Sequence, residues 1–244
     1  MKLILLILLN VTLMSAQPVF AVASIKPSNN LAGVEGGCHG IDTNRSPVPL
    51  GRCVITEGRL SHMISIAWHV STKNVKSEPD WIARGSDRFN LEAKAEDPKT
   101  ATEQQLIQML QALLIERFKL KFHFEEVQES GYALVVAKNA PKLKESTAER
   151  MNFAGRPSGG KPVAMTLQKV SMFWLAEFFS DYGPGPTADK TGVTGDYDFT
   201  LNWDDTAGPS LFNALEEQLG LKLVAQKVTR SVFVVDSAEK PMPN

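Results

Sequence analysis

The chain has 244 residues, of which 43% are hydrophobic, with 26 basic and 27 acidic side chains and a formal net charge of −1. Charges of both signs are interspersed along it, so nothing favours nucleic acid or anionic lipid as a partner. The apolar content is that of an ordinary globular protein, large enough for two small domains or one larger one.

The first residues have the pattern of a secretory signal peptide. Met1-Lys2 precedes an apolar run over residues 3–14, which ends in Ser15-Ala16. The run is shorter than the roughly 20 residues of a membrane-spanning helix. We therefore expect residues 1–16 to be removed, no transmembrane segment in the mature chain, and a soluble protein in the periplasm or the extracellular medium.

Two cysteines, Cys38 and Cys53, lie in the part expected to be exported, where an even cysteine count indicates a disulfide. We expect residues 17–52 to form an N-terminal strand and a disulfide loop. Closing this loop stabilises the fold by about 3 kcal/mol on the chain-entropy model. A catalytic role for Cys38 beside His39 is disfavoured, because adjacent loop residues do not orient a thiol and an imidazole as a catalytic pair.

A first module is predicted over residues 53–143. It begins with a short strand and an amphipathic helix near 60–68, followed by a strand at 89–93 whose apolar residues alternate. Thr100 and Glu103 predict a capping box for a second helix, which ends near Arg117. Two further strands, 120–124 and 132–137, are expected to form a hairpin across Ser130-Gly131, and one more short strand is expected near Val75.

A second module is predicted over residues 163–240, after a linker at 144–162 and before a tail at 241–244. It has a strand at 163–170, helices capped by Ser171 and Ser210, an alternating strand at 197–203 and a closing hairpin at 221–236. The predicted fold class is therefore α+β: two tandem repeats of a β-α-β-α-β-β module, each sheet with its helices on one face.

The repeat rests on matching segments of the two modules. Residues 116–122, Glu-Arg-Phe-Lys-Leu-Lys-Phe, correspond to residues 217–223, Glu-Gln-Leu-Gly-Leu-Lys-Leu. The matching positions are apolar rather than reactive. Repetition of core positions predicts a fold, whereas a functional site has to be argued from its own chemistry.

The sequence contains no convincing catalytic, cofactor or metal motif. Residues 155–161, Gly-Arg-Pro-Ser-Gly-Gly-Lys, resemble a phosphate-binding loop, but Pro162 replaces the required hydroxyl and no helix follows. The four histidines lack metal-ligand spacing, and the carboxylate pairs are adjacent residues that diverge. We therefore predict no catalytic residues, no cofactor and no metal.

Four residues outside the repeated core positions form the candidate ligand surface: Trp81, Asp87, Asp189 and Tyr197. Trp81 follows Pro79-Asp80 and has no place on an apolar stripe, whereas the other three tryptophans are predicted to be core residues. Asp189 and Tyr197 flank a glycine-rich stretch, which is read as tight turns with a ligand loop as the alternative.

Several motifs occur together in one order: Val22-Ala-Ser-Ile-Lys-Pro27, Pro79-Asp-Trp81, Asp87-Arg-Phe89, Leu113-Leu-Ile-Glu-Arg-Phe-Lys-Leu120, Asp189-Lys-Thr-Gly192, Gly195-Asp-Tyr-Asp-Phe199 and Glu217-Gln-Leu-Gly-Leu-Lys222. In this combination the chain resembles the soil-associated protein family, exported bacterial proteins of unknown function, over nearly the whole mature chain. Fusion of that family to membrane metallopeptidase sensors implies a sensing or binding role in the envelope. The order of elements also resembles the short N-terminal domain of secretins and TonB-dependent receptors, which implies binding of other proteins by strand addition.

The function expected is that of a non-enzymatic binding or interaction module of the cell envelope, with another envelope protein as partner. One alternative is an envelope hydrolase whose site lies between the two modules, where Trp81, Asp87, Asp189 and Tyr197 converge. The other is a structural component that assembles through sheet edges.

Overall fold

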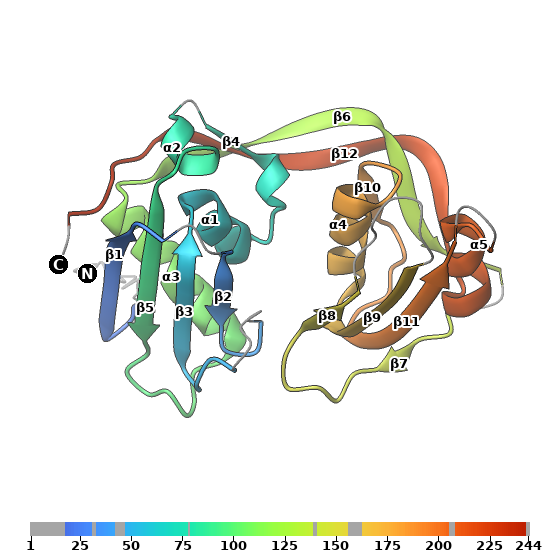
Figure 1. Ribbon diagram of the computed structural model, residues 1–244, viewed down its shortest axis with the longest axis horizontal. Helices are drawn as coiled ribbons and strands as arrows, with labels where there is room; N and C mark the ends of the chain where they lie inside the picture. The colour runs from blue at the N-terminus through green and yellow to red at the C-terminus, as the bar shows by residue number, and fades with distance from the viewer. Residues whose placement is uncertain are drawn as a thin grey trace, which may run out of the picture.

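A computed structural model describes residues 18–30, 33–41, 47–77, 79–138, 141–155, 163–204 and 208–242. The predicted signal peptide lies outside these residues. Figure 1 shows two halves side by side, each with a sheet and helices, joined by two long strands. This is an α+β fold, as predicted.

The sheet of the first half is antiparallel. Its order is β1 (Val22–Ser28), β5 (Arg88–Lys94), β3 (Arg52–Gly58) and β2 (Glu35–Cys38). Ile55 and Leu91 are buried on one face, while Glu92 and Lys94 are exposed on the other. The buried face packs against α1 (Leu60–Trp68) and α3 (Glu103–Arg117) in one apolar core.

The helix α3 has a different N-terminal cap from the one that the sequence indicated. Thr102 Oγ1 accepts the Gln105 backbone N–H and Gln105 Oε1 accepts the Thr102 N–H, so the capping box is Thr102–Gln105 rather than Thr100–Glu103. Both pairs have the required spacing, which is why the pattern alone does not separate them. A short 3₁₀ turn (Thr72–Asn74) and the short helix α2 (Asp80–Ala83) precede β5.

The second half has a sheet with the order β7 (Lys144–Glu145), β11 (Tyr197–Trp203), β9 (Val163–Val170) and β8 (Asn152–Ala154). Its core includes residues of α4 (Met172–Tyr182), of α5 (Leu211–Ala214) and of the π-helical turn Leu215–Leu219. Residues 144–162 were predicted to be a linker, but 144–145 and 152–154 form edge strands. These strands are exposed and only two and three residues long, so they show no apolar alternation by which to predict them.

The two predicted hairpins are absent, because each is one continuous strand. β6 (Lys121–Val136) and β12 (Leu221–Ser237) pair antiparallel along almost their whole length, with Leu221 opposite Val136 and Phe233 opposite Phe124. Gly131, expected in a turn, is extended: a Cβ there would lie 2.2 Å from the Pro186 carbonyl oxygen. The glycine permits close approach of another segment and does not reverse the chain.

Two short strands extend this ribbon. β4 (Val75–Ser77) lies parallel to β12 and β10 (Thr187–Asp189) lies parallel to β6, which gives the order β10-β6-β12-β4. The short strand expected near Val75 is thus present as β4. Apart from the short helix α2, residues 52–136 and 163–237 each run β-α-β-β-α-β, with one long strand where the prediction β-α-β-α-β-β had two. β6 and β12 both run from one half of the fold to the other. The end of β12 therefore packs in the first half, and the end of β6 packs in the second.

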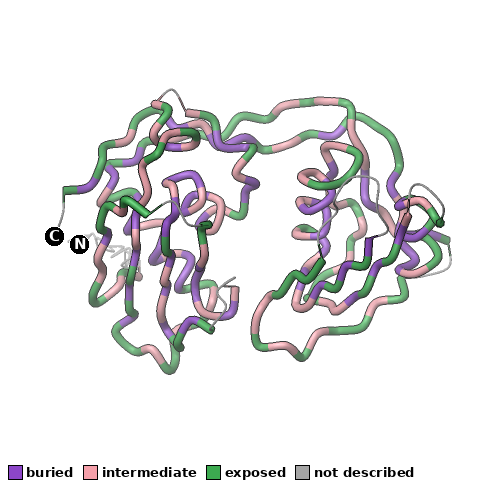
Figure 2. The backbone as a smooth tube through the Cα atoms, viewed as in Figure 1, coloured by how far each residue is buried: buried purple, intermediate pink, exposed green. Residues whose placement is uncertain are grey.

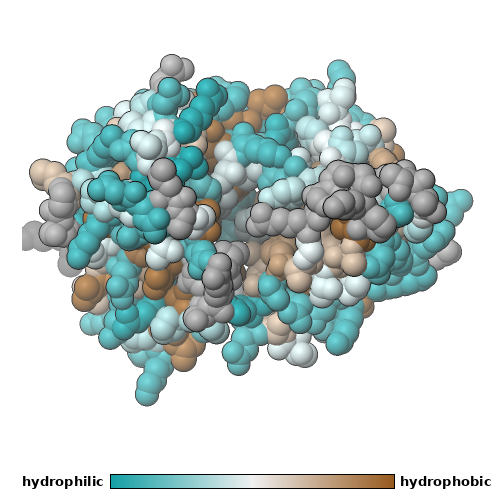
Figure 3. Space-filling view, viewed as in Figure 1, coloured by the Kyte–Doolittle hydropathy of each residue, from teal (hydrophilic) through white to brown (hydrophobic). Residues whose placement is uncertain are grey.

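There are two apolar cores, one in each half. Phe233 and Val235 of β12 belong to the first core, whereas Leu134 of β6 belongs to the second. Figure 2 shows buried segments within both halves and a mostly exposed or half-buried stretch where the ribbon crosses. Hydrophilic side chains cover much of the surface in Figure 3.

The predicted disulfide between Cys38 and Cys53 is present and fully buried, and it links directly opposed residues of β2 and β3. It joins the edge strand to the sheet. Among the helices that the structure describes, none is both long and apolar enough to cross a membrane.

Candidate binding cleft between the two halves

A cavity of about 450 Å³ lies between the two halves of the molecule, and we call it the cleft. From the first half it is lined by Ser65 of α1 and by Ser71 and Thr72 at the 3₁₀ turn; from the second, by residues of α4 and β8. Its two walls come from segments that are far apart in the sequence. The long ribbon brings them together.

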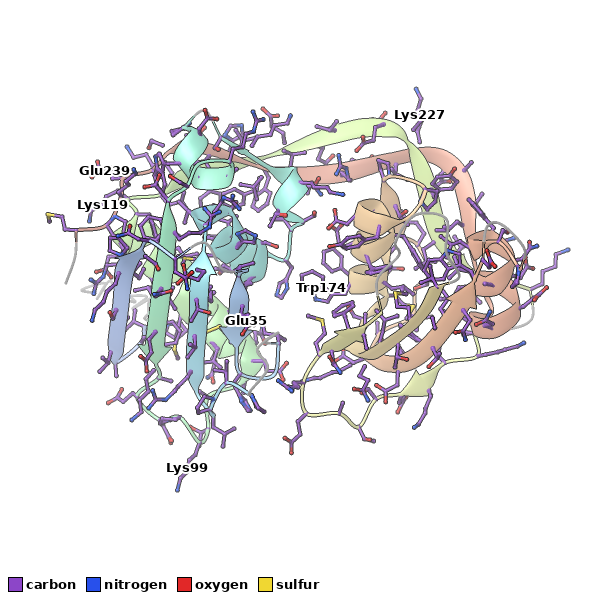
Figure 4. All side chains as sticks on the ribbon, in the orientation of Figure 1. Glu35, Lys99, Lys119, Trp174, Lys227 and Glu239 are labelled. Carbon is purple, nitrogen blue, oxygen red and sulfur yellow. A yellow bond between two sulfur atoms is a disulfide. The ribbon has the colours of Figure 1, made fainter. Side chains whose placement is uncertain are left out.

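One side of the cleft is aromatic. Phe153 of β8 stacks on Phe178 of α4 with ring centroids 6.2 Å apart, and Phe178 contacts Tyr182 at 5.1 Å. Phe153 is 36% exposed and Tyr182 49%, so their rings are accessible although they pack together. Trp174 lies on the side of α4 that faces the first half (Figure 4). We call these four residues the aromatic wall.

Asp181 of α4 connects the second half to the first. The Ser71 hydroxyl donates to its carboxylate at 3.1 Å, and Lys73 Nζ lies 3.1 Å from Oδ1. Lys73 also donates to the Asp181 backbone carbonyl at 2.9 Å. Asp181 is therefore already satisfied by groups of the opposite half.

Glu177, one turn before Asp181, is not satisfied in this way. Its Oε2 is buried and has no hydrogen-bond partner among the described residues. Burial raises the pKa of Glu177 from 4.5 to about 7, and the negative charge of Asp181 adds to the rise; Arg230 and the Ser71 backbone N–H oppose it. The carboxyl can therefore accept or donate a hydrogen bond near neutral pH.

A second cavity, of about 340 Å³, lies against the other side of Glu177. His69, Asp189 and Arg230 line it, and Arg230 contacts both Asn74 and Glu129. Burial lowers the pKa of His69, whose ring lies 6.1 Å from that of Trp174. Its lining is more polar than that of the cleft and offers no comparable aromatic surface among the described residues.

Another set of polar contacts joins the halves away from Asp181. Lys169 of β9 forms an ion pair with Glu103 of α3 and also donates to the Gly40 carbonyl. The Met151 backbone N–H donates to the same carbonyl at 3.3 Å. Besides the ribbon, the halves thus meet through polar contacts at separate places.

The structure does not bring the four predicted surface residues into one site. Trp81 packs against Phe118 with centroids 6.3 Å apart, and Lys240 lies over its ring while pairing with Asp87 at 2.6 Å. Trp81 and Asp87 therefore both belong to the first half.

The other two predicted residues belong to the second half. Asp189 accepts from Thr191 at the second cavity, and the Tyr197 hydroxyl donates to the Thr194 carbonyl beside β11. Among the contacts that the structure describes, none joins these two residues to Trp81 or Asp87, and the ribbon juxtaposes α4 with residues 69–74. The convergence of the four residues stays a prediction.

Glu177, Asp181 and Phe153 are not among the site residues predicted from the sequence. A usable signal existed for Glu177, the one carboxylate in the apolar run of residues 172–179. Trp174 was predicted to be a core residue; it is half-buried, packs against the second core and also lines the cleft. Phe153 carried no signal, since it lies in the polar stretch whose composition predicts a linker.

The part of the chain that the structure describes holds no group of three or more His, Cys, Asp or Glu side chains able to bind a metal ion. What the cleft offers is an aromatic surface beside hydroxyls, the charged side chains of Arg150 and Asp181, and one oxygen of Glu177 without a described partner. Pockets that bind small molecules commonly combine these features.

Fold and cleft together define a class of protein: a two-half α+β protein with a ligand-sized cavity at the junction. Residues 61–238 match DUF3738, a family of proteins of unknown function, and the chain belongs to this family. No curated protein and no solved structure matches the chain.

Proposed function

We propose that the protein is an exported binding protein of the cell envelope that holds its ligand in the cleft between its two halves. The observation that carries this proposal is Glu177, whose Oε2 is buried without a partner among the described residues, beside accessible aromatic rings. A buried carboxylate oxygen without a donor is costly, and a bound ligand can supply that donor.

The size and composition of the cleft support the proposal. About 450 Å³ is within the range of pockets that hold small ligands, and such pockets are mostly apolar with a few placed polar groups. The halves meet through polar contacts such as Ser71–Asp181 and Lys169–Glu103, which exchange readily with water. Ligand entry requires only that some of these contacts open.

The setting in the envelope rests on other observations. The predicted signal peptide and the Cys38–Cys53 disulfide fit an oxidising compartment. The resemblance to the soil-associated family and, more weakly, to the secretin domain supports a binding role. The partner expected from these resemblances is another envelope protein, which would carry the ligand. Pairing through edge strands such as β2 and β8 stays a prediction, and concentration-dependent oligomers in light scattering would support it.

A hydrolase is the second candidate, and the raised pKa of Glu177 favours it. A carboxyl with a pKa of about 7 suits a general acid, and Asp181 offers an ionised partner one turn away. In a hydrolase, Glu177→Gln would abolish turnover of a substrate that still binds. In a binding protein no turnover would be seen in the parent chain either.

A thermal-shift screen tests the proposal even though the ligand is unidentified. The mature chain is screened against oligosaccharides, short peptides, polyamines and phospholipid headgroups, because a ligand that binds only the folded state raises the melting temperature. A binder should lose its effect in Tyr182→Ala and Phe153→Ala but keep it in Phe212→Ala, whose ring is exposed outside the cleft. Binders unaffected by the cleft variants, or no binder at all, would contradict the proposal.

A further inference from the structure

We infer that the cleft takes a saccharide, a ligand with both an apolar ring face and several hydroxyl groups. This inference rests on the proposed function and names the chemical class of its ligand. Three features of the cleft support it: the geometry of the aromatic wall, the mixture of polar groups opposite it and the unsatisfied oxygen of Glu177.

The accessible part of the aromatic wall is contributed by Phe153 and Tyr182. Phe153 and Phe178 are nearly parallel, with 16° between their planes, and the Tyr182 ring lies 37° from that of Phe178. Phe178 is only 8% exposed, so the accessible surface consists of the Phe153 and Tyr182 rings that pack against it. The C–H bonds on one face of a sugar ring pack against the electron-rich faces of such rings.

The polar part of the lining provides both donors and acceptors. Ser65 and Thr72 contribute hydroxyls, and Asn152 contributes an amide that can do both. A sugar hydroxyl also donates and accepts, so this mixture matches it group by group. Arg150 also lines the cleft, so a cationic group lies beside these neutral donors and acceptors.

Glu177 provides the acceptor that a sugar hydroxyl needs. Its Oε2 has no described partner, whereas Asp181 already accepts from Ser71 and pairs with Lys73. A neutral hydroxyl satisfies the oxygen without bringing a second buried charge.

Isothermal titration calorimetry of the mature chain at pH 7 tests the inference. The saccharides are cellotriose, maltotriose, chitotriose and the N-acetylglucosamine–N-acetylmuramic acid disaccharide, with trilysine, tetra-alanine and spermidine as the non-saccharide arms. We expect at least one saccharide to bind with one-to-one stoichiometry. Tyr182→Ala should weaken it about tenfold through the lost ring contact, and Glu177→Gln about tenfold through replacement of the carboxyl by an amide.

Phe212→Ala is the matched control, since it removes an exposed ring outside the cleft and should leave the affinity unchanged. Saccharide binding that survives both cleft variants would overturn the inference. If only trilysine, tetra-alanine or spermidine binds, and the cleft variants abolish that binding, the ligand class is wrong while the proposed function stands. If nothing binds, both fail.

Discussion

Gln128 of β6 lies directly opposite Thr229 of β12, at the middle of the ribbon that joins the two halves. The two positions also correspond to each other. Tyr132 of β6 pairs with the first residue of β10, and Phe233 of β12 pairs with the first residue of β4, so Tyr132 and Phe233 are equivalent positions. They are 101 residues apart in the sequence, and the same separation relates Gln128 to Thr229. A residue that pairs with its own counterpart marks an approximate two-fold axis, and rotation about it exchanges the halves.

Backbone conformations elsewhere follow the same relation. Glu57 and Lys169, each two residues before a helix N-cap, have φ of 55° and 52°. Their backbone N–H groups donate to side-chain oxygens of Asn90 and Asp198 on the neighbouring strands. Such coincidences support an internal duplication, which stays a hypothesis about the origin of the chain.

The two-fold relation yields a prediction at Lys119. This exposed residue has φ of 48°, and its counterpart in the second half is Gly220 with φ of 66°. A left-handed conformation costs a non-glycine residue about 1 kcal/mol, so Lys119→Gly should raise the free energy of unfolding by roughly 0.5–1 kcal/mol and Gly220→Ala should lower it by about 1 kcal/mol. Urea denaturation measures both. Lys119→Ala is the control, and an equal gain from it would refute the backbone explanation.

The exchange of strands predicts that the end of the chain stabilises its beginning. Phe233 is fully buried in the first core, with its ring 4.4 Å from Phe122 and 5.0 Å from Trp68. Phe233→Ala should lower the free energy of unfolding by about 3–5 kcal/mol through the cavity it leaves. Equilibrium unfolding followed by circular dichroism measures this loss. Phe212→Ala, at a ring that is 39% exposed, should cost far less, and equal losses would contradict the assigned packing.

A cut chain should remain assembled. A protease site inserted between Thr147 and Ala148 falls between β7 and β8. After cleavage, β6 belongs to one fragment and β12 to the other, while the Cys38–Cys53 disulfide lies within the first fragment and cannot hold them together. Size-exclusion chromatography should show one peak in native buffer and two species in denaturant. Separation in native buffer would rule out the shared ribbon.

The pH dependence of stability should report the environment of Glu177. Its pKa is raised from 4.5 to about 7 in the folded protein, so between these values the folded state keeps a proton that the unfolded state has lost. The Glu177 contribution to stability therefore falls as pH rises from 4.5 to 7 and is constant above that. Relative to the parent chain, Glu177→Gln should become progressively more stable over the same range.

Comparison with the parent at each pH is needed, because His62 acts in the opposite direction. Burial and the neighbouring Arg59 lower the His62 pKa to about 4, so its contribution to stability falls as pH drops from 6.5 to 4. Glu126→Gln, at an exposed carboxylate of β6, controls for the loss of one charge. A pH-independent difference between Glu177→Gln and the parent chain would show that Glu177 is not buried as described.

Much of the fold could be predicted, because local periodicity specifies it. The apolar stripes of α1 and α3, the alternation of β5 and β11 and the cysteine count predict elements near their observed places. The continuous strand β6 could not be predicted, since Ser130-Gly131 has the composition of a turn and the close approach of Pro186 to Gly131 is visible only in the structure. A local pattern carries no information about a contact made so far along the chain.

The cleft was harder to predict for the same reason. The hydrogen bond between Ser71 and Asp181 joins residues 110 positions apart, and neither belongs to a recognisable motif. Phe153 lies in a stretch whose composition predicts a linker. Only Glu177, a carboxylate within an apolar helix, breaks a local rule, and such violations occur preferentially at functional sites.

The proposed function depends most on where the ligand is held, which we place in the cleft between the halves. The most direct measurement is a crystal structure of the mature chain with the tightest binder from the calorimetric panel. We predict ligand density against Phe153 and Tyr182, with a ligand donor within hydrogen-bond distance of Glu177 Oε2. Density for the ligand elsewhere on the molecule, with the cleft holding only water, would contradict this placement.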